Sequence, residues 1–199
     1  QAAAITALIV SIGLLQAAIV TTGLGPRIAD IILSVSDGSL LMTAILAVVA
    51  ATLLGMGMPT PIAYLLLAMF TAPALTAAGA PLLGAHLFLF YFAIKSGSTP
   101  PVALVAVVAA GIARANWWST AVTARVHSLP GFIVAFMFLF SPALLLQGDP
   151  MTVALSACSA AIGVFAMAAA VQGWCAGRIN WIERALLAAA AISLINPGY

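Results

Sequence analysis

Two stretches decide the fold of this chain: Gly-Met-Gly-Met-Pro-Thr-Pro at residues 55–61 and Lys-Ser-Gly-Ser-Thr-Pro-Pro at residues 95–101. Each interrupts apolar sequence long enough to lie in a bilayer. A proline has no N–H to donate to the carbonyl four residues back, so a helix running through these prolines would leave four carbonyls without donors. Those carbonyls belong to Gly55, Gly57, Ser96 and Gly97. Such backbone is tolerated at membrane depth only inside protein or beside a cavity, so both breaks are predicted to handle something polar.

The composition indicates the class of protein. Hydrophobic residues make up 65% of the 199 residues and charged residues 5%, whereas a soluble domain carries about 25% charge. The sequence therefore predicts an all-α polytopic membrane protein that lies in a lipid bilayer. A net charge of +2 without a basic cluster gives no surface for nucleic acid, so that partner is set aside.

Apolar segments of about 20 residues, or shorter arms beside a break, mark the expected helices. They are Ala3 to Gly23, Ser39 to Met58, Thr60 to Ala78, Gly84 to Lys95, Pro100 to Ala113, Pro130 to Leu146, Met151 to Gln172 and Trp181 to Ile195. The chain divides into a transmembrane and an interfacial helix (1–38), a hairpin with a broken helix (39–113), a second interfacial helix (114–128) and C-terminal transmembrane helices (129–199). Because it begins in hydrophobic sequence, we expect it to be part of a longer protein.

The charges predict a topology. If Gly84 to Ala113 is one broken crossing and the arms around Pro59 return to their starting side, then four arginines fall on one face of the membrane and two aspartates on the other. The positive-inside rule makes the arginine face cytoplasmic. The arginines are Arg114, Arg125, Arg178 and Arg184, and the aspartates are Asp37 and Asp149.

The chemistry of the breaks indicates a cation-binding site and an anion-binding site side by side. Thr60-Pro61 and Thr99-Pro100 each place a hydroxyl at an N-cap with proline following, which predicts two new helix starts, and helix N-termini attract carboxylates. Freed carbonyls with the Thr60, Ser98 and Thr99 hydroxyls would form an oxygen-only site for a hard cation such as sodium. These features predict a cation-coupled anion symporter with no cofactor beyond the coupling ion, Na⁺ or H⁺. The plainer interpretation is a pair of proline kinks whose carbonyls are paired again by nearby hydroxyls.

Several stretches also resemble a known family. They are Leu-Gly-Met-Gly-Met-Pro-Thr (54–60), His-Leu-Phe-Leu-Phe-Tyr-Phe (86–92), Thr-Pro-Pro-Val-Ala (99–103) with Ala-Ala-Gly-Ile-Ala (109–113), and Phe-Met-Phe (136–138) with Pro-Ala-Leu-Leu-Leu (142–146). Together they are similar to the large, fused membrane subunit of TRAP-type (tripartite ATP-independent periplasmic) transporters, in the branch served by TAXI-type binding proteins. The similarity extends over nearly the whole chain and corresponds to the C-terminal inverted repeat with additional helices.

This resemblance implies an elevator-type transporter with a re-entrant hairpin in the bacterial inner membrane, importing a small organic acid. Its implied partners are a periplasmic substrate-binding protein and a small membrane subunit, which can be fused. The implied sodium ligands are Gly55, Ser96, Thr99 and Val102, the second and fourth through backbone carbonyls. Adding the freed carbonyls of Gly57 and Gly97 completes the predicted cation site, and the predicted substrate site comprises Thr60, Lys95, Ser98 and Thr99.

The chain departs from the family pattern at two positions. Ser96 replaces a small residue, which a carbonyl ligand tolerates. Lys95 replaces an apolar residue, and a charge at membrane depth is costly enough to suggest a function. Three roles stay open for it: contacting the substrate carboxylate, replacing or weakening the sodium ion, or snorkelling to the membrane surface.

Two other classes of function fit the sequence less well. An intramembrane enzyme of acyl- or glycosyl-transfer type would need an acid or base at depth, and the sequence offers no paired carboxylates or nucleophile motif. A structural channel or scaffold subunit would not need two helix starts that face an anion. His86 is interpreted as a hydrogen-bonded packing residue rather than a proton relay.

Overall fold

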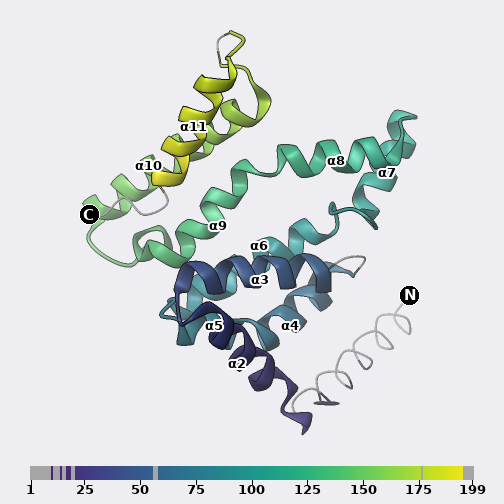
Figure 1. Cartoon of the computed structure of the whole chain (residues 1–199), viewed down its shortest axis with the longest axis vertical. Coiled ribbons are helices and arrows are strands. Elements are labelled where there is room, and N and C mark those ends of the chain that lie inside the picture. Colours follow the sequence, from purple (N-terminus) through teal and green to yellow (C-terminus); the bar gives the residue numbers. More distant parts are fainter. Residues whose placement is uncertain are drawn as a thin grey trace.

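The computed structural model describes residues 10, 14, 17, 18, 21–55, 58–175 and 177–194, and these form helices with no strand. The predicted all-α class is confirmed (Figure 1). The first predicted span, Ala3 to Gly23, lies mostly outside the described residues. The first helix with described bounds is α2, Leu24–Ser36, in the segment expected to be interfacial.

The predicted hairpin consists of α3 (Leu40–Gly55) and α4 (Thr60–Phe70), which flank the first break. The arm after the break was expected to be continuous to Ala78, but it divides into α4 and the short α5 (Ala72–Ala77). Pro73 explains this division, because it has no N–H for the carbonyl of Met69. Thr71, between the two helices, donates its hydroxyl to the Leu67 carbonyl at 2.6 Å.

Helix α6 (Leu82–Ser96) lies at the centre of the lower part of the molecule in Figure 1 and packs against α3, α4 and α9 (Pro130–Phe140). The side of α3 that is buried carries only small residues and one threonine, which allows close helix approach. From α6 come the larger core side chains, with Phe88 and Leu89 fully buried. The main hydrophobic core therefore holds the hairpin against α6.

The second break separates α6 from α7 (Leu104–Ala113). Helix α7 packs mainly on α8 (Trp117–His127), the second segment expected to be interfacial. Asn116 caps α8 by accepting hydrogen bonds from the backbone N–H groups of Trp118 and Ser119. Helix α9 then returns to α6, so the chain after the second break first moves away from the hairpin and then comes back to it (Figure 1).

The C-terminal part is a helical pair, α10 (Pro150–Gln172) and α11 (Trp181–Ser193), preceded by the 3₁₀ turn η1 (Pro142–Leu145). Arg184 of α11 donates to the carbonyls of Ala170 at 2.7 Å and Val171 at 3.0 Å. These carbonyls belong to the last turn of α10, which lacks intrahelical donors, so Arg184 stabilises the end of that helix.

In the described part of the chain, α10 is the one unbroken helix whose length and apolar composition suffice to cross a membrane. Helices α8 and α9 meet the same criterion only as a pair, bent by 44° at their junction. The hairpin helices and α6 are apolar but shorter, because α3 and α6 end at a break and α4 begins at one.

Candidate functional site at two helix breaks

The two breaks meet at Gly55 and Ser96, which are 41 residues apart in sequence. Both residues are buried, and a Cβ atom placed on Gly55 would lie 2.6 Å from the Ser96 Cβ and 3.1 Å from its hydroxyl. Real Cβ atoms do not approach that closely, so only glycine allows this contact. The structure thus brings together the end of α3 and the end of α6, two of the four positions in the predicted sodium site.

The carbonyl of Lys95 organises the second break. It accepts hydrogen bonds from the Thr99 hydroxyl at 2.9 Å, the Ser98 hydroxyl at 3.0 Å and the Ser98 backbone N–H at 3.1 Å. The prediction that Thr99-Pro100 starts a helix is therefore wrong. Thr99 caps the end of α6, and α7 begins at Leu104, after Ala103 in the left-handed conformation with φ of 43°.

The carbonyls predicted to lack donors are paired. Met58 donates its N–H to Gly55 at 3.3 Å, Thr99 to Ser96 at 3.0 Å and Val105 to Gly97 at 3.1 Å. The expectation of freed carbonyls is wrong at these three positions, because the chain turns within each break and supplies local donors. The fourth, Gly57, lies outside the described residues. A carbonyl oxygen has two lone pairs, so each of the three keeps one for a further partner.

The hydroxyl of Thr99 is buried, and its proton is engaged within the chain. Thr99 is 5% exposed, and it gives its proton to the Lys95 carbonyl. A hydroxyl whose proton is engaged in this way directs its lone pairs elsewhere, and only those can contact a cation. Ser98 is less buried but has the same arrangement.

The remaining predicted site residues lie at the edges of this region. Thr60 is the first residue of α4, but Pro59 is its N-cap and makes no side-chain cap hydrogen bond, so the predicted capping role of Thr60 is wrong by one position. Val102 follows Pro101 in the turn before α7 and is 38% exposed. Among the described residues, no group of three or more His, Cys, Asp and Glu side chains could hold a metal ion. A cation at these breaks would therefore be held by hydroxyl and carbonyl oxygens.

A basic side chain that the sequence assigned to the membrane surface reaches the break. Arg125 of α8 donates from Nη1 to the Thr99 hydroxyl oxygen at 3.4 Å, and its guanidinium lies 5.0 Å from the centre of the Phe132 ring. The Lys95 ammonium lies 5.4 Å from the centre of the Tyr91 ring. The Tyr91 and Phe132 rings meet edge to face at 6.2 Å, which joins both cations to one aromatic cluster.

Nothing in the local sequence signals the contact between Arg125 and Thr99, which are 26 residues apart. The helical period offers one indirect clue. Ala121 lies four residues before Arg125, on the same face of α8, and is buried together with Ala103 and Ala106 of the second break and α7. An arginine on the buried face of an apolar helix is directed into the protein, although its partner appears only in the fold.

We compared the chain with known proteins and protein families. The family model described as the tripartite ATP-independent periplasmic transporter, DctM component, matches residues 1–149. The chain belongs to this family. No curated protein and no solved structure matches it.

The matched part of this DctM chain contains both breaks, Lys95 and Arg125, whereas α10 and α11 lie beyond it. The DctM component is a membrane permease of a transporter and not an enzyme, so the alternative of an intramembrane transferase is excluded. Transporters of this type work with a periplasmic binding protein and a transported substrate.

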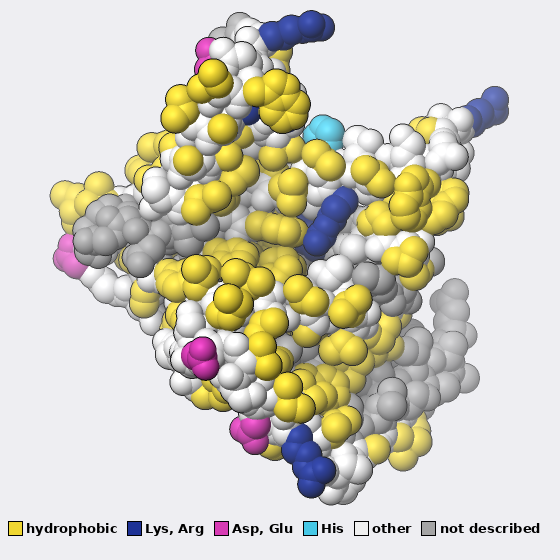
Figure 2. Space-filling view, in the orientation of Figure 1, with side chains coloured by type: hydrophobic (Ala, Val, Ile, Leu, Met, Phe, Trp, Pro, Cys, Tyr) yellow, Lys and Arg dark blue, Asp and Glu magenta, His cyan; other side chains and the backbone are white. Residues whose placement is uncertain are grey.

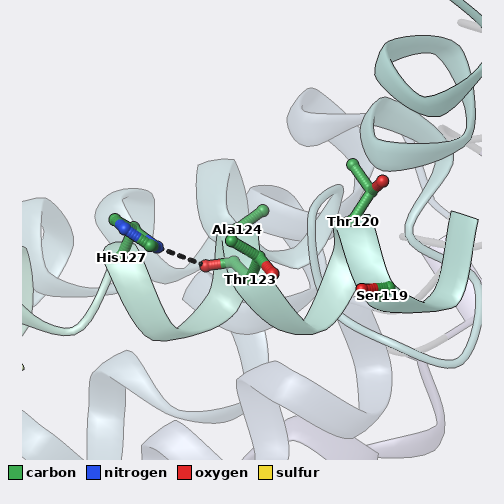
Figure 3. A pocket seen from close by; sticks show the side chains of 5 residues that line it. All are labelled: Ser119, Thr120, Thr123, Ala124 and His127. Atoms are coloured by element: carbon green, nitrogen blue, oxygen red, sulfur yellow. Dashed lines mark hydrogen bonds between the residues drawn. The ribbon is translucent and has the colours of Figure 1, made fainter. Parts of the chain in front are cut away.

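Two other polar features of this DctM chain lie away from the breaks. His86 Nδ1 and the Tyr64 hydroxyl lie 3.0 Å apart and tie α6 to α4, which supports the interpretation of His86 as a packing residue. On α8, an open hollow is lined by one face of the helix, where the Nδ1 atom of His127 lies 2.8 Å from the Thr123 carbonyl (Figure 3). Arg125 points to another side of α8, so this hollow is not part of the candidate site.

Proposed function

We propose that this DctM chain forms the permease part of a cation-coupled secondary transporter that imports a small organic acid. The acid is delivered by a periplasmic substrate-binding protein, in the branch served by TAXI-type binding proteins. A small membrane subunit, separate or fused, completes the assembly. The chain crosses the bacterial inner membrane several times, and its hairpin and broken helix move together in an elevator-type mechanism.

The observation that carries this proposal is the contact between Gly55 and Ser96. It joins the C-terminal ends of α3 and α6, and the Ser96 carbonyl accepts a hydrogen bond from the backbone N–H of the buried Thr99 at 3.0 Å. The lone pairs of the Gly55 and Ser96 carbonyls and of the Thr99 hydroxyl are oxygen donors of the kind that hard cations prefer. Discontinuous helices of this kind hold coupling ions in other secondary transporters.

Coupling follows from charge. A transported carboxylate is attracted by a nearby cation, so an ion bound at the breaks would raise the affinity for the acid, and the acid would raise the affinity for the ion by the same factor. Movement of the whole hairpin from one side of the membrane to the other would then carry the bound ion and the bound acid across together.

The test is uptake into proteoliposomes that contain the complete transporter, with its binding protein added outside and an imposed sodium gradient. The substrate is the acid that co-purifies with the binding protein. We expect uptake that needs both the binding protein and the sodium gradient, and a Thr99→Val variant whose half-saturating sodium concentration rises at least tenfold.

Thr71→Val is the matched control, because Thr71 is also buried and donates its hydroxyl to the carbonyl four residues back, but far from the breaks. It should keep the parent's sodium dependence. Uptake that persists without binding protein and without any cation gradient would indicate a channel and refute the proposal.

A further inference from the structure

Two basic residues meet the Thr99 hydroxyl at the second break, Arg125 through its guanidinium and Lys95 through its backbone carbonyl. The Thr99 oxygen contacts Arg125 Nη1 at 3.4 Å and the backbone carbonyl of Lys95 at 2.9 Å. The Lys95 side chain leaves α6 at this carbonyl and the Arg125 side chain arrives from α8, and their charged ends lie over the two rings of one aromatic pair, Lys95 over Tyr91 and Arg125 over Phe132.

Neither cation has an acidic partner within the described ranges of the chain. The four acidic residues of the sequence are Asp30, Asp37, Asp149 and Glu183. Asp149 and Glu183 are engaged at the N-termini of α10 and α11, and Asp30 and Asp37 belong to α2 and its end. In the face shown in Figure 2, a basic side chain is visible near the centre, amid hydrophobic and uncharged surface, and the acidic side chains lie away from it.

We propose that Arg125 binds the carboxylate of the transported acid and that Lys95 supplies the second positive charge of this site. The inference rests on the proposed function and adds a residue from α8 to a site otherwise built from the breaks. A guanidinium presents two parallel N–H donors that match a carboxylate, and stacking on Phe132 leaves those edge donors available. Its hydrogen bond to Thr99 is long, at 3.4 Å, and engages Nη1.

Burial makes the interaction useful. Arg125 and Lys95 are each partly buried, so a carboxylate between them would be screened less than one at an open surface. Because α8 is not part of the hairpin, a carboxylate held by Arg125 also bridges α8 and the second break. The acid would then contact both parts of the protein at once.

The experiment uses the complete transporter in nanodiscs of phosphatidylcholine at fixed sodium, with succinate and acetate as probes and binding measured by equilibrium dialysis. We expect Arg125→Gln to weaken succinate binding about 10- to 100-fold, the loss typical of a charge-assisted hydrogen-bond pair. Lys95→Met should weaken it less, about 3- to 10-fold. Arg125→Lys keeps the positive charge but lacks the planar guanidinium, so its succinate affinity should lie between those of the parent and Arg125→Gln. This variant also replaces Arg125→Gln in the test if the glutamine variant does not fold.

Arg114→Gln is the control, because Arg114 is an exposed arginine at the end of α7, 11 residues before Arg125, and lies outside both breaks. It should bind succinate like the parent. Unchanged succinate binding in both Arg125 variants overturns the proposal, and so does a parent protein that binds neither probe.

A second arm separates the acid from a lipid phosphate, which offers similar chemistry. The same proteins are placed in nanodiscs with added phosphatidylglycerol, and their thermal stability is compared. If Arg125→Gln loses stabilisation by phosphatidylglycerol while succinate binding is unchanged, the guanidinium belongs to a lipid and the proposal is refuted. Sodium-dependent uptake with the binding protein separates the two possible failures. If only the role of Arg125 is wrong, this uptake persists in Arg125→Gln; if the proposed function is wrong, the parent shows no such uptake.

Discussion

Gly55→Ala tests the meeting point of the two breaks. The new Cβ would lie 2.6 Å from the Ser96 Cβ, whereas carbon atoms pack best at about 3.5–4.0 Å, so the helix ends must separate by roughly 1 Å. Overpacking of this size costs about 1–3 kcal/mol, and alanine recovers up to about 1 kcal/mol of that through its higher helix propensity. We expect a net destabilisation of about 1–2 kcal/mol, together with a loss of sodium-dependent uptake.

Ser96→Gly should rescue this variant. It removes the clashing Cβ, after which the nearest neighbour of the new methyl group is the Ala63 Cβ at 4.0 Å, an ordinary contact. Alone, Ser96→Gly costs about 1–2 kcal/mol, because it lowers helix propensity and removes the hydroxyl bond to the Ala93 carbonyl. The double variant should therefore be about as stable as Ser96→Gly, which is a favourable coupling of about 1–2 kcal/mol.

The assay is equilibrium unfolding of the complete transporter in mixed micelles, followed by uptake in proteoliposomes. Gly111→Ala is the control, because Gly111 is also helical but has no atom within 4 Å of its added Cβ, and it should be neutral or slightly stabilising. Additive effects of Gly55→Ala and Ser96→Gly would refute the reasoning, since they would mean that the two residues do not touch.

Three further predictions concern charge. Arg125→Gln should lower the half-saturating sodium concentration about tenfold when sodium binding is measured without the acid. The reason is that a cation at Thr99 and a guanidinium about 4–6 Å away repel by about 3–4 kcal/mol before solvent screening. An unchanged half-saturating concentration would place the sodium elsewhere. Lys95→Met should reduce transport several-fold at normal abundance, because it removes a positive charge at the site and relieves the membrane of a costly group; transport equal to the parent would make Lys95 a snorkelling residue. Asp149 and Arg178 lie beyond opposite ends of the 23-residue α10. A cysteine replacing Asp149 should be labelled by an impermeant reagent from the periplasmic side, and one replacing Arg178 should be labelled only after the membrane is opened. Reversed labelling would invert the topology.

Much of the local fold could be predicted because it depends on near neighbours in sequence. Runs of apolar residues predicted most of the helices, and prolines predicted where α3 and α6 end. Errors arose where a single polar group had two possible partners. Thr99 could cap the following helix or the preceding one, and the preceding carbonyl of Lys95 was nearer, so the predicted helix start moved to Leu104.

The sequence by itself determined the membrane class, the two breaks and the DctM family, because composition, proline chemistry and motif are properties of the chain in order. Only the tertiary structure decided that Gly55 touches Ser96 and that Arg125 reaches Thr99. Such contacts depend on how α3, α6 and α8 cross, and those crossings are set by packing of side chains distant in sequence. An arginine that the topology rule assigns to a membrane surface was thereby brought beside a buried hydroxyl.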